Sequence, residues 1–259
     1  MKLTAFLRSR IKAARKRDAR WVRVLDVARL LPTAEGRARL WTRVVHGRAV
    51  HQTTPQTADD RYPALFDLAA ELASGAARIL SFGCSTGEEL VALRRRFARA
   101  EIVGAEINPR SRKIAARRVA DDPRTRVVGP RAIDGTFDLI FALAVLQREP
   151  HRVEETGSED LSSAYPFVRF DAAVTELVAH LRPGGLLCVM HAHYRVEDSS
   201  AAAGGLEPVN VAPVMTGPFF GRDGLRLRGA TGQSIFRKRG QAGGRGGGRS
   251  RSRSASPVR

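Results

Sequence analysis

A short apolar run that ends in a glycine-bearing turn, followed at once by a helix start, constrains this fold more than any other feature. The stretch ILSFGCSTGEE at residues 79–89 carries Gly83 and Gly87 in the turn, and Glu88 and Glu89 open the helical pattern after it. A tight strand-to-helix turn of this kind is typical of an open α/β sheet, in which ligands bind at the carboxyl ends of the strands. The stretch therefore predicts an α/β fold with a ligand site at this turn.

The rest of the chain continues the alternation of strands and helices. We expect further strands at 101–107, 126–128, 186–192 and 234–238, a strand beginning at 137, and helices at 34–47, 64–74, 88–97, 109–120 and 170–181. The last helix is expected to stop at the Pro183-Gly184-Gly185 turn. Strands and helices alternating at this spacing predict a doubly wound, mostly parallel sheet.

Positive charge is concentrated at the two ends of the chain. Residues 1–50 hold 14 basic and 3 acidic residues, and residues 240–259 hold 5 arginines and no acid, so the ends account for +16 of the net charge of +18. Helical patterns at 3–17 and 19–31 indicate that residues 1–50 form a basic helical extension. Residues 240–259 are rich in Gly, Arg and Ser, and this composition predicts a disordered tail. Residues 51–239 are left as the main domain. Both ends are candidates for contact with RNA or another acidic surface.

Cysteine content and hydropathy limit the class of protein further. Cys84 and Cys188 are too few for a disulfide framework or a zinc site, so no metal is expected and a reducing cytoplasm is the predicted location. No apolar run reaches the length of about 18 residues that a membrane span needs.

The acids at the predicted turn indicate which ligand suits it. A pyrophosphate binds at the positive end of a helix dipole, but Glu88 and Glu89 already occupy that end. They repel phosphate and favour a ligand with an ammonium or sulfonium group. Glu106 lies 19 residues after Gly87, close to the spacing at which an acid binds ribose hydroxyls. Together these residues describe a site for adenosine with a cationic amino-acid arm, which is S-adenosylmethionine (SAM).

With these residues in view, the chain resembles class I SAM-dependent methyltransferases over about residues 55–239. FGCSTGEE is similar to the STGEE loop of chemotaxis-receptor methyltransferases, and DRYPALF, FDLIFALAVLQR, LRPGGLL and SIFRK resemble the neighbouring blocks. The resemblance implies a Rossmann-like methyltransferase sheet with an antiparallel last strand, and SAM as cofactor. It implies that Gly83–Gly87 line the methionine part of SAM, that Glu88 contacts its charged end, and that Glu106 holds the ribose. The cofactor-binding set is completed from these segments and from the end of the fourth strand: Gly83, Cys84, Ser85, Thr86, Gly87, Glu88, Glu106, Ile107, Ala142 and Ala144.

The sequence departs from the family pattern at two places. Many members carry an acid at the position of Ser81, and this chain does not. The third strand runs into Val128-Gly129-Pro130-Arg131, which offers no acid for the adenine amino group, so backbone amides or Asp134 are the candidates for that contact.

The methyl acceptor is not identified by the sequence. Transfer from a sulfonium is an in-line displacement, which needs a general base only if the acceptor must lose a proton. The catalytic candidates follow the fourth and fifth strands: Gln147, His191, His193 and Tyr194. The acidic insert 149–169 lies where a substrate loop would lie, and an exposed loop is the simpler interpretation.

Two alternatives come from other classes of protein. Gly83–Gly87 also spells G-x-S-x-G, the nucleophile elbow of α/β-hydrolases, with Ser85 as nucleophile, Asp138 or Glu149 as the acid and His191 or His193 as the base. This alternative leaves Glu88, Glu89 and Glu106 without a role. The other alternative is a non-enzymatic RNA-binding protein that acts through its basic ends, although the chain shows none of the usual RNA-binding signatures.

Overall fold

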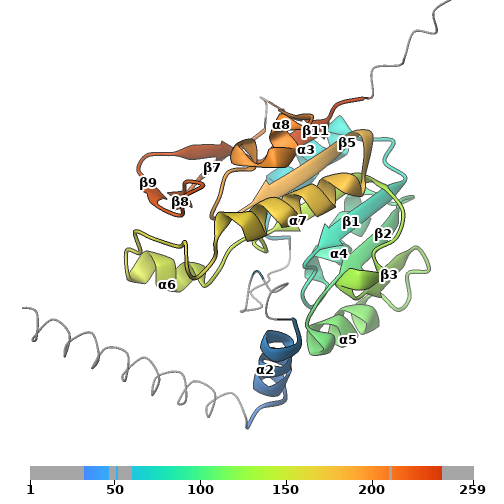
Figure 1. Cartoon of the computed structure of the whole chain (residues 1–259). Helices are drawn as coiled ribbons and strands as arrows, with labels where there is room; N and C mark the ends of the chain where they lie inside the picture. Colours follow the sequence, from blue (N-terminus) through green and yellow to red (C-terminus); the bar gives the residue numbers. More distant parts are fainter. Residues whose placement is uncertain (1–31, 47–50, 52–59, 210–211, 241–259) are drawn as a thin grey trace, which may run out of the picture.

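The computed structural model of the chain describes residues 32–46, 51, 60–209 and 212–240 (Figure 1). The expected helices at 3–17 and 19–31 and the tail at 240–259 therefore lie almost wholly outside the described residues. The expected helix at 34–47 is present as α2 (Ala34–His46). Among the described residues, no helix is both long enough and apolar enough to cross a membrane.

A seven-stranded sheet forms the centre of the fold, in the order β3-β2-β1-β4-β5-β11-β6. Its parallel strands are β1 (Arg78–Phe82), β2 (Glu101–Ala105), β3 (Thr125–Val128), β4 (Phe137–Leu143) and β5 (Leu181–Met190). β11 (Ile235–Lys238) runs antiparallel to β5 and to the edge strand β6 (Leu206–Pro208). The doubly wound sheet and its antiparallel last strand are thus confirmed.

Alternating side chains of the strands bury the two faces of the sheet under different helices. Ile79 and Ile102 pack with residues of α3 (Pro63–Leu72), α4 (Glu88–Arg96) and α5 (Pro109–Arg118). Their neighbours Leu80 and Val103 point to the opposite face and pack with α7 (Phe167–Ala179). Because β1, β2 and β4 are buried on both faces, a ligand is expected at their carboxyl ends, as in other open α/β sheets.

Shorter elements lie between β3 and β4, in the insert, and in the part of the chain after β5. They are the 3-10 helices Pro130–Ala132 and Val196–Asp198, α6 (Pro150–Glu155), α8 (Ser200–Ala203), and two two-stranded sheets, β7 (Val214–Thr216) with β10 (Thr231–Gln233) and β8 (Phe219–Phe220) with β9 (Arg226–Leu227).

The fifth strand begins earlier than the glycine turn predicts. Helix α7 ends at Ala179, and β5 starts at Leu181, opposite Phe137, before the Pro-Gly-Gly sequence. The pairing then shifts, so that the next pair is Leu139 with Leu186. The turn, with Gly184 at φ +80°, is therefore a bulge within the strand and does not precede it.

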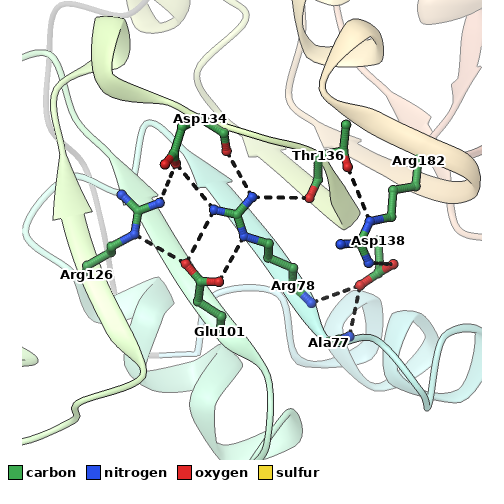
Figure 2. Close-up of polar contacts among 8 residues, drawn as sticks. All are labelled: Ala77, Arg78, Glu101, Arg126, Asp134, Thr136, Asp138 and Arg182. Carbon is green, nitrogen blue, oxygen red and sulfur yellow. Dashed lines mark hydrogen bonds and ion pairs between the residues drawn. The ribbon is translucent and has the colours of Figure 1, made fainter.

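An ion-pair network closes the sheet at the amino ends of the strands (Figure 2). The Arg78 guanidinium donates to Glu101 at 2.9 Å and to the carbonyl of Asp134 at 3.0 Å, and it lies 4.8 Å from the ring centroid of Phe137. One carboxylate oxygen of Asp138 accepts from the backbone N–H groups of Ala77 and Arg78, both at 2.9 Å. The network joins β1, β2 and β4 at the edge opposite the expected site.

Replacing Arg78 by alanine should lower the free energy of unfolding by about 1–2 kcal/mol, because a largely buried guanidinium loses several hydrogen bonds and a ring contact. A matched control is Arg228→Ala, which removes a highly exposed pair with Glu159 and should change stability by less than about 0.5 kcal/mol. Urea titration measures both. Equal effects of the two substitutions would contradict the importance given to the Arg78 network.

Candidate functional site

The loop after β1 has the backbone conformation that its glycines predict. Gly83 has φ +83° and Gly87 has φ +94°, and Gly87 is the N-cap residue of α4. A Cβ atom at Gly83 would lie 2.7 Å from Cγ2 of Val145, which follows β4. The loop therefore lies directly against the end of β4, and only glycine fits at position 83. Ser85 also has a positive φ, of +51°, although it is not glycine.

Glu106 lies against this loop. Its side chain is buried, with Oε2 accepting from the backbone N–H of Ser85 at 2.9 Å and Oε1 accepting from the N–H of Asn108 at 2.7 Å. Burial raises the pKa of Glu106, while the bonds from Asn108 and Ser85 oppose that shift. Helix α5 is capped by the Asn108 side chain, which accepts from the N–H of Arg110 at 2.9 Å. Capping the helix is therefore not the task of Glu106.

The two acids at the start of α4 have different surroundings. Glu88 accepts from Thr86 Oγ1 and from Arg118 at 2.7 Å, so its charge is already paired. Glu89 accepts from Ser81 Oγ at 2.7 Å, and burial raises the pKa of Glu89 to about 7. The carboxyl group of Glu89 thus lies beside Ser81, where many relatives carry an acid. Glu89 is not in the predicted cofactor-binding set, although the absence of an acid at position 81 was a signal that could have indicated it.

The remaining expected cofactor residues lie at the ends of β1, β2 and β4. The Cys84 side chain points inward, since a Cβ atom at Gly104 would lie 2.9 Å from its Sγ. Ala142 is fully buried in β4, and Ala144 follows that strand with φ +54° and donates its N–H to the Met190 carbonyl at 2.8 Å. Ile107 directly follows Glu106 and is half-buried. The strand order places these ends side by side.

Two hydroxyl groups at this edge are buried without a hydrogen-bond partner among the described residues. They are Ser85 Oγ, in the loop after β1, and Tyr62 Oη, on the residue before α3. A buried hydroxyl without a partner is costly unless a bound group supplies one. These two oxygens are therefore available to a ligand at the carboxyl ends of the strands.

The four catalytic candidates differ in how their polar atoms are used. His193 Nε2 lies 2.9 Å from the Arg148 carbonyl, the buried Tyr194 hydroxyl donates to the Tyr165 carbonyl, and Gln147 Nε2 donates to the Ala144 carbonyl at 3.2 Å. His191 is exposed, has φ +52°, and its ring centroid lies 5.6 Å from that of Tyr62. His191 is thus the candidate whose ring is most open to an acceptor.

The insert 149–169 is exposed over much of its length, as its acids suggested, but it contains α6 and is anchored to the core. Val153, Leu161 and Tyr165 are buried in the core, and Asp160 forms a bridge with Leu225. The acidic side chains occupy the outer positions between these apolar anchors. The insert also brings Tyr165 to within 2.6 Å of His51 Nδ1, a contact between residues 114 positions apart that the sequence does not reveal.

Two other expectations are wrong because the residues lie at the opposite edge of the sheet. Asp134 forms ion pairs with Arg78 and Arg126 at the amino ends of the strands, where it cannot reach an adenine at the carboxyl ends (Figure 2). Asp138 belongs to the same edge, paired with Arg182 at 2.8 Å, so it cannot orient a histidine for Ser85. Glu149, the other acid of the hydrolase alternative, pairs with Arg152 at 3.3 Å.

In the part of the chain that the structure describes, no three His, Cys, Asp or Glu side chains gather in a way that could hold a metal ion.

Known methyltransferases are similar to the part of the chain that forms this site. A family model described as a methyltransferase domain matches residues 49–220. A trans-aconitate 2-methyltransferase of Deinococcus radiodurans is 26% identical over 131 residues, which are 48% of this chain and 44% of that protein. The chain thus spans less than half the length of this curated relative.

Solved methyltransferase structures are also similar to the chain. One is the N-methyltransferase NodS from Bradyrhizobium japonicum in complex with S-adenosyl-L-homocysteine, with 18% identity, a TM-score of 0.43, and coverage of 69% of this chain and 86% of that one. Another is the SAM-bound amino pentose methyltransferase CalS10 from Micromonospora echinaspora, with 25% identity, a TM-score of 0.38, and coverage of 61% and 58%.

Proposed function

Because the chain belongs to the family of methyltransferase domains, we propose that it transfers a methyl group from SAM and that loop 83–87, Glu106 and the end of β4 bind this donor. The observation that carries this proposal is the contact between Glu106 and the loop, at 2.9 Å from its carboxylate to the Ser85 N–H. SAM supplies a methyl group activated by a sulfonium. The residues of the chain have to bind, orient and shield it.

The residues present fit such a donor. A carboxylate accepts from two vicinal hydroxyls, and Glu106 offers both oxygens of a buried carboxyl group at the end of β2. The partnerless Ser85 hydroxyl lies in the adjoining loop. Val145 packs against Gly83 and so brings the segment after β4 close to the same ligand.

We assign the cationic arm of the donor to Glu89 rather than to Glu88. The Glu88 carboxylate is neutralised by Arg118, whereas Glu89 is bonded only to a serine hydroxyl among the described residues. A buried carboxylate without a cation is unfavourable, and a bound ammonium or sulfonium removes that cost. Glu89 thereby takes the place of the acid that Ser81 lacks.

We place the methyl acceptor beside the ends of β4 and β5, next to His191 and Tyr62. The similarity to a methyltransferase named for trans-aconitate supports a small-molecule acceptor. A role of residues 1–50 and 240–259 in binding RNA stays a prediction.

Calorimetric titration of the purified chain tests the proposed donor site. We expect SAM and S-adenosylhomocysteine to bind with micromolar dissociation constants, and NAD to bind at least about 100-fold more weakly, because acids at the start of α4 repel a pyrophosphate. Binding of NAD as tight as that of SAM, or no binding of SAM, would contradict the proposal.

A further inference from the structure

Five aromatic or imidazole rings gather beside the ends of β4 and β5, and we call them the acceptor-side cluster. Its members are His51, Tyr62, Tyr165, His191 and His193. His51 Nδ1 lies 2.6 Å from the Tyr165 hydroxyl, and the Tyr165 ring centroid lies 6.4 Å from that of His193. These distances define two groups of rings from four segments of the chain: His51, Tyr165 and His193, which are buried, and Tyr62 with the exposed His191. The two groups adjoin at residues 191–193, directly after β5.

Three arginines surround the acceptor-side cluster. The Arg61 guanidinium carbon lies 5.3 Å from the ring centroid of Tyr62, and that of Arg169 lies 5.7 Å from the ring centroid of Tyr165. Arg148 follows β4, and the positive charge of its side chain acts to lower the pKa values of His51 and Tyr165. Each of these three arginines also makes another interaction. A bound anion is therefore inferred only from the positions of their positive charges.

The rings themselves add no positive charge at neutral pH. Burial, together with the positive charges of Arg169 and Arg148, lowers the pKa of His51 to about 4. Burial lowers the pKa of His193, and the bond to the Arg148 carbonyl and the charge of Glu154 oppose that shift. Partial desolvation of its ring and the charge of Arg61 lower the pKa of His191, which Glu154 opposes. The charges that act on the cluster are therefore those of the three arginines against two acids, Glu154 and Glu89. This leaves an excess of positive charge, which favours an anion and repels a cationic amine.

We propose that the methyl acceptor is a small-molecule carboxylate held by Arg61, Arg148 and Arg169; this rests on the proposed function. One carboxylate oxygen uses a lone pair to form the new O–CH3 bond, while the C–S bond breaks and its electron pair remains on sulfur. The anion and the sulfonium become a neutral methyl ester and a neutral thioether, so no proton has to leave. An acceptor of this class needs no general base, which suits a cluster where His51 and His193 already have partners.

A methylation assay with acceptors of known charge tests this proposal through the chemical class of the product. The chain is incubated with methyl-tritiated SAM and either trans-aconitate or tricarballylate, with tricarballylic triamide and putrescine as neutral and cationic counterparts. We expect label only with the carboxylates, and its release as volatile methanol in alkali, as for a methyl ester. Label in putrescine or the triamide, label that is stable to alkali, or no labelling of either carboxylate would overturn the proposal.

Binding provides a readout that does not depend on turnover. In calorimetry with S-adenosylhomocysteine present, the dissociation constant of tricarballylate should rise about 10-fold in Arg148→Gln and in Arg169→Gln, with the affinity for SAM unchanged. Arg152→Gln is the matched control, since this side chain is 76% exposed on α6 and pairs with Glu149. Equal affinity of all three variants for tricarballylate would overturn the proposal.

Two further measurements use the unmodified chain and therefore do not depend on whether a variant folds. They also distinguish failure of this proposal from failure of the proposed function. In the unmodified chain, tricarballylate affinity should fall several-fold between 50 and 500 mM salt, as expected for charge pairing; a salt-independent affinity would count against it. Failure to bind SAM would defeat the proposed function itself, whereas tight SAM binding without carboxylate binding would defeat only this inference.

Discussion

Replacing Glu106 by alanine should weaken SAM binding about 100-fold. The buried carboxylate is expected to accept from both ribose hydroxyls, and hydrogen bonds to a charged group contribute roughly 1.5–3 kcal/mol, where 1.4 kcal/mol corresponds to a factor of ten. The variant also loses the acceptor for the N–H groups of Ser85 and Asn108, so a modest loss of stability accompanies it. Calorimetric titration with SAM measures the first effect and urea titration the second.

Two companion variants separate a binding role from a structural one. Glu106→Gln keeps the side-chain shape and one acceptor oxygen, and should still lose at least about 10-fold in SAM affinity. Glu101→Gln is the control from the other end of the same strand, where Glu101 pairs with Arg78 and Arg126. It should leave SAM affinity unchanged. If Glu101→Gln and Glu106→Gln behave alike, the role given to Glu106 is wrong.

Glu89→Gln should make the free protein more stable and its complex with SAM weaker. The folded-state pKa of Glu89 is raised from 4.5 to about 7, so its ionisation opposes folding as the pH rises from about 4.5 to 7. Glutamine accepts from Ser81 without that cost, and at pH 8 it should raise the free energy of unfolding by about 2–3 kcal/mol. At pH 4 the two proteins should differ little in stability. Urea titration at both values checks the sign.

The loss of the Glu89 charge should also weaken SAM binding by roughly 10-fold or more at pH 8, because the cation loses its buried partner. Between pH 8 and pH 6 this difference between the variant and the unmodified protein should shrink, as Glu89 itself becomes protonated. Taking the ratio of the two dissociation constants removes the titration of the ligand. Glu88→Gln, in which Arg118 loses its partner, should affect SAM affinity less. A larger effect of Glu88→Gln than of Glu89→Gln would show that Glu88, and not Glu89, binds the cationic arm of SAM.

Local patterns in the sequence predicted the parallel sheet and the loop against which Glu106 lies. The glycines at 83 and 87 require a turn, and the apolar runs around it are too short for anything but buried strands. The resemblance supplied the antiparallel β11, which the structure confirms. The division into an extension at 1–50, a domain at 51–239 and a tail at 240–259 stays a prediction.

What the sequence did not reveal depends on contacts between distant segments. The predicted strand start at 137 already implied that Asp134 and Asp138 lie at the amino edge, but no local period indicates their pairing with Arg78, Arg126 and Arg182. The hydrogen bond between His51 and Tyr165 joins residues that are far apart in the sequence. Glu88 and Glu89 differ because only Glu88 points toward Arg118, and neighbouring residues of a helix point in different directions. The Pro-Gly-Gly sequence failed as a boundary because a bulge keeps the strand paired across it.

A crystal structure with S-adenosylhomocysteine tests most directly whether the donor binds at loop 83–87 and Glu106. We predict that both ribose hydroxyls lie within hydrogen-bond distance of the Glu106 carboxylate, that the homocysteine part crosses loop 83–87, and that its ammonium group lies nearest to Glu89. A nucleoside bound elsewhere on the sheet, with the Glu106 carboxylate still bonded only to Ser85 and Asn108, would contradict the account.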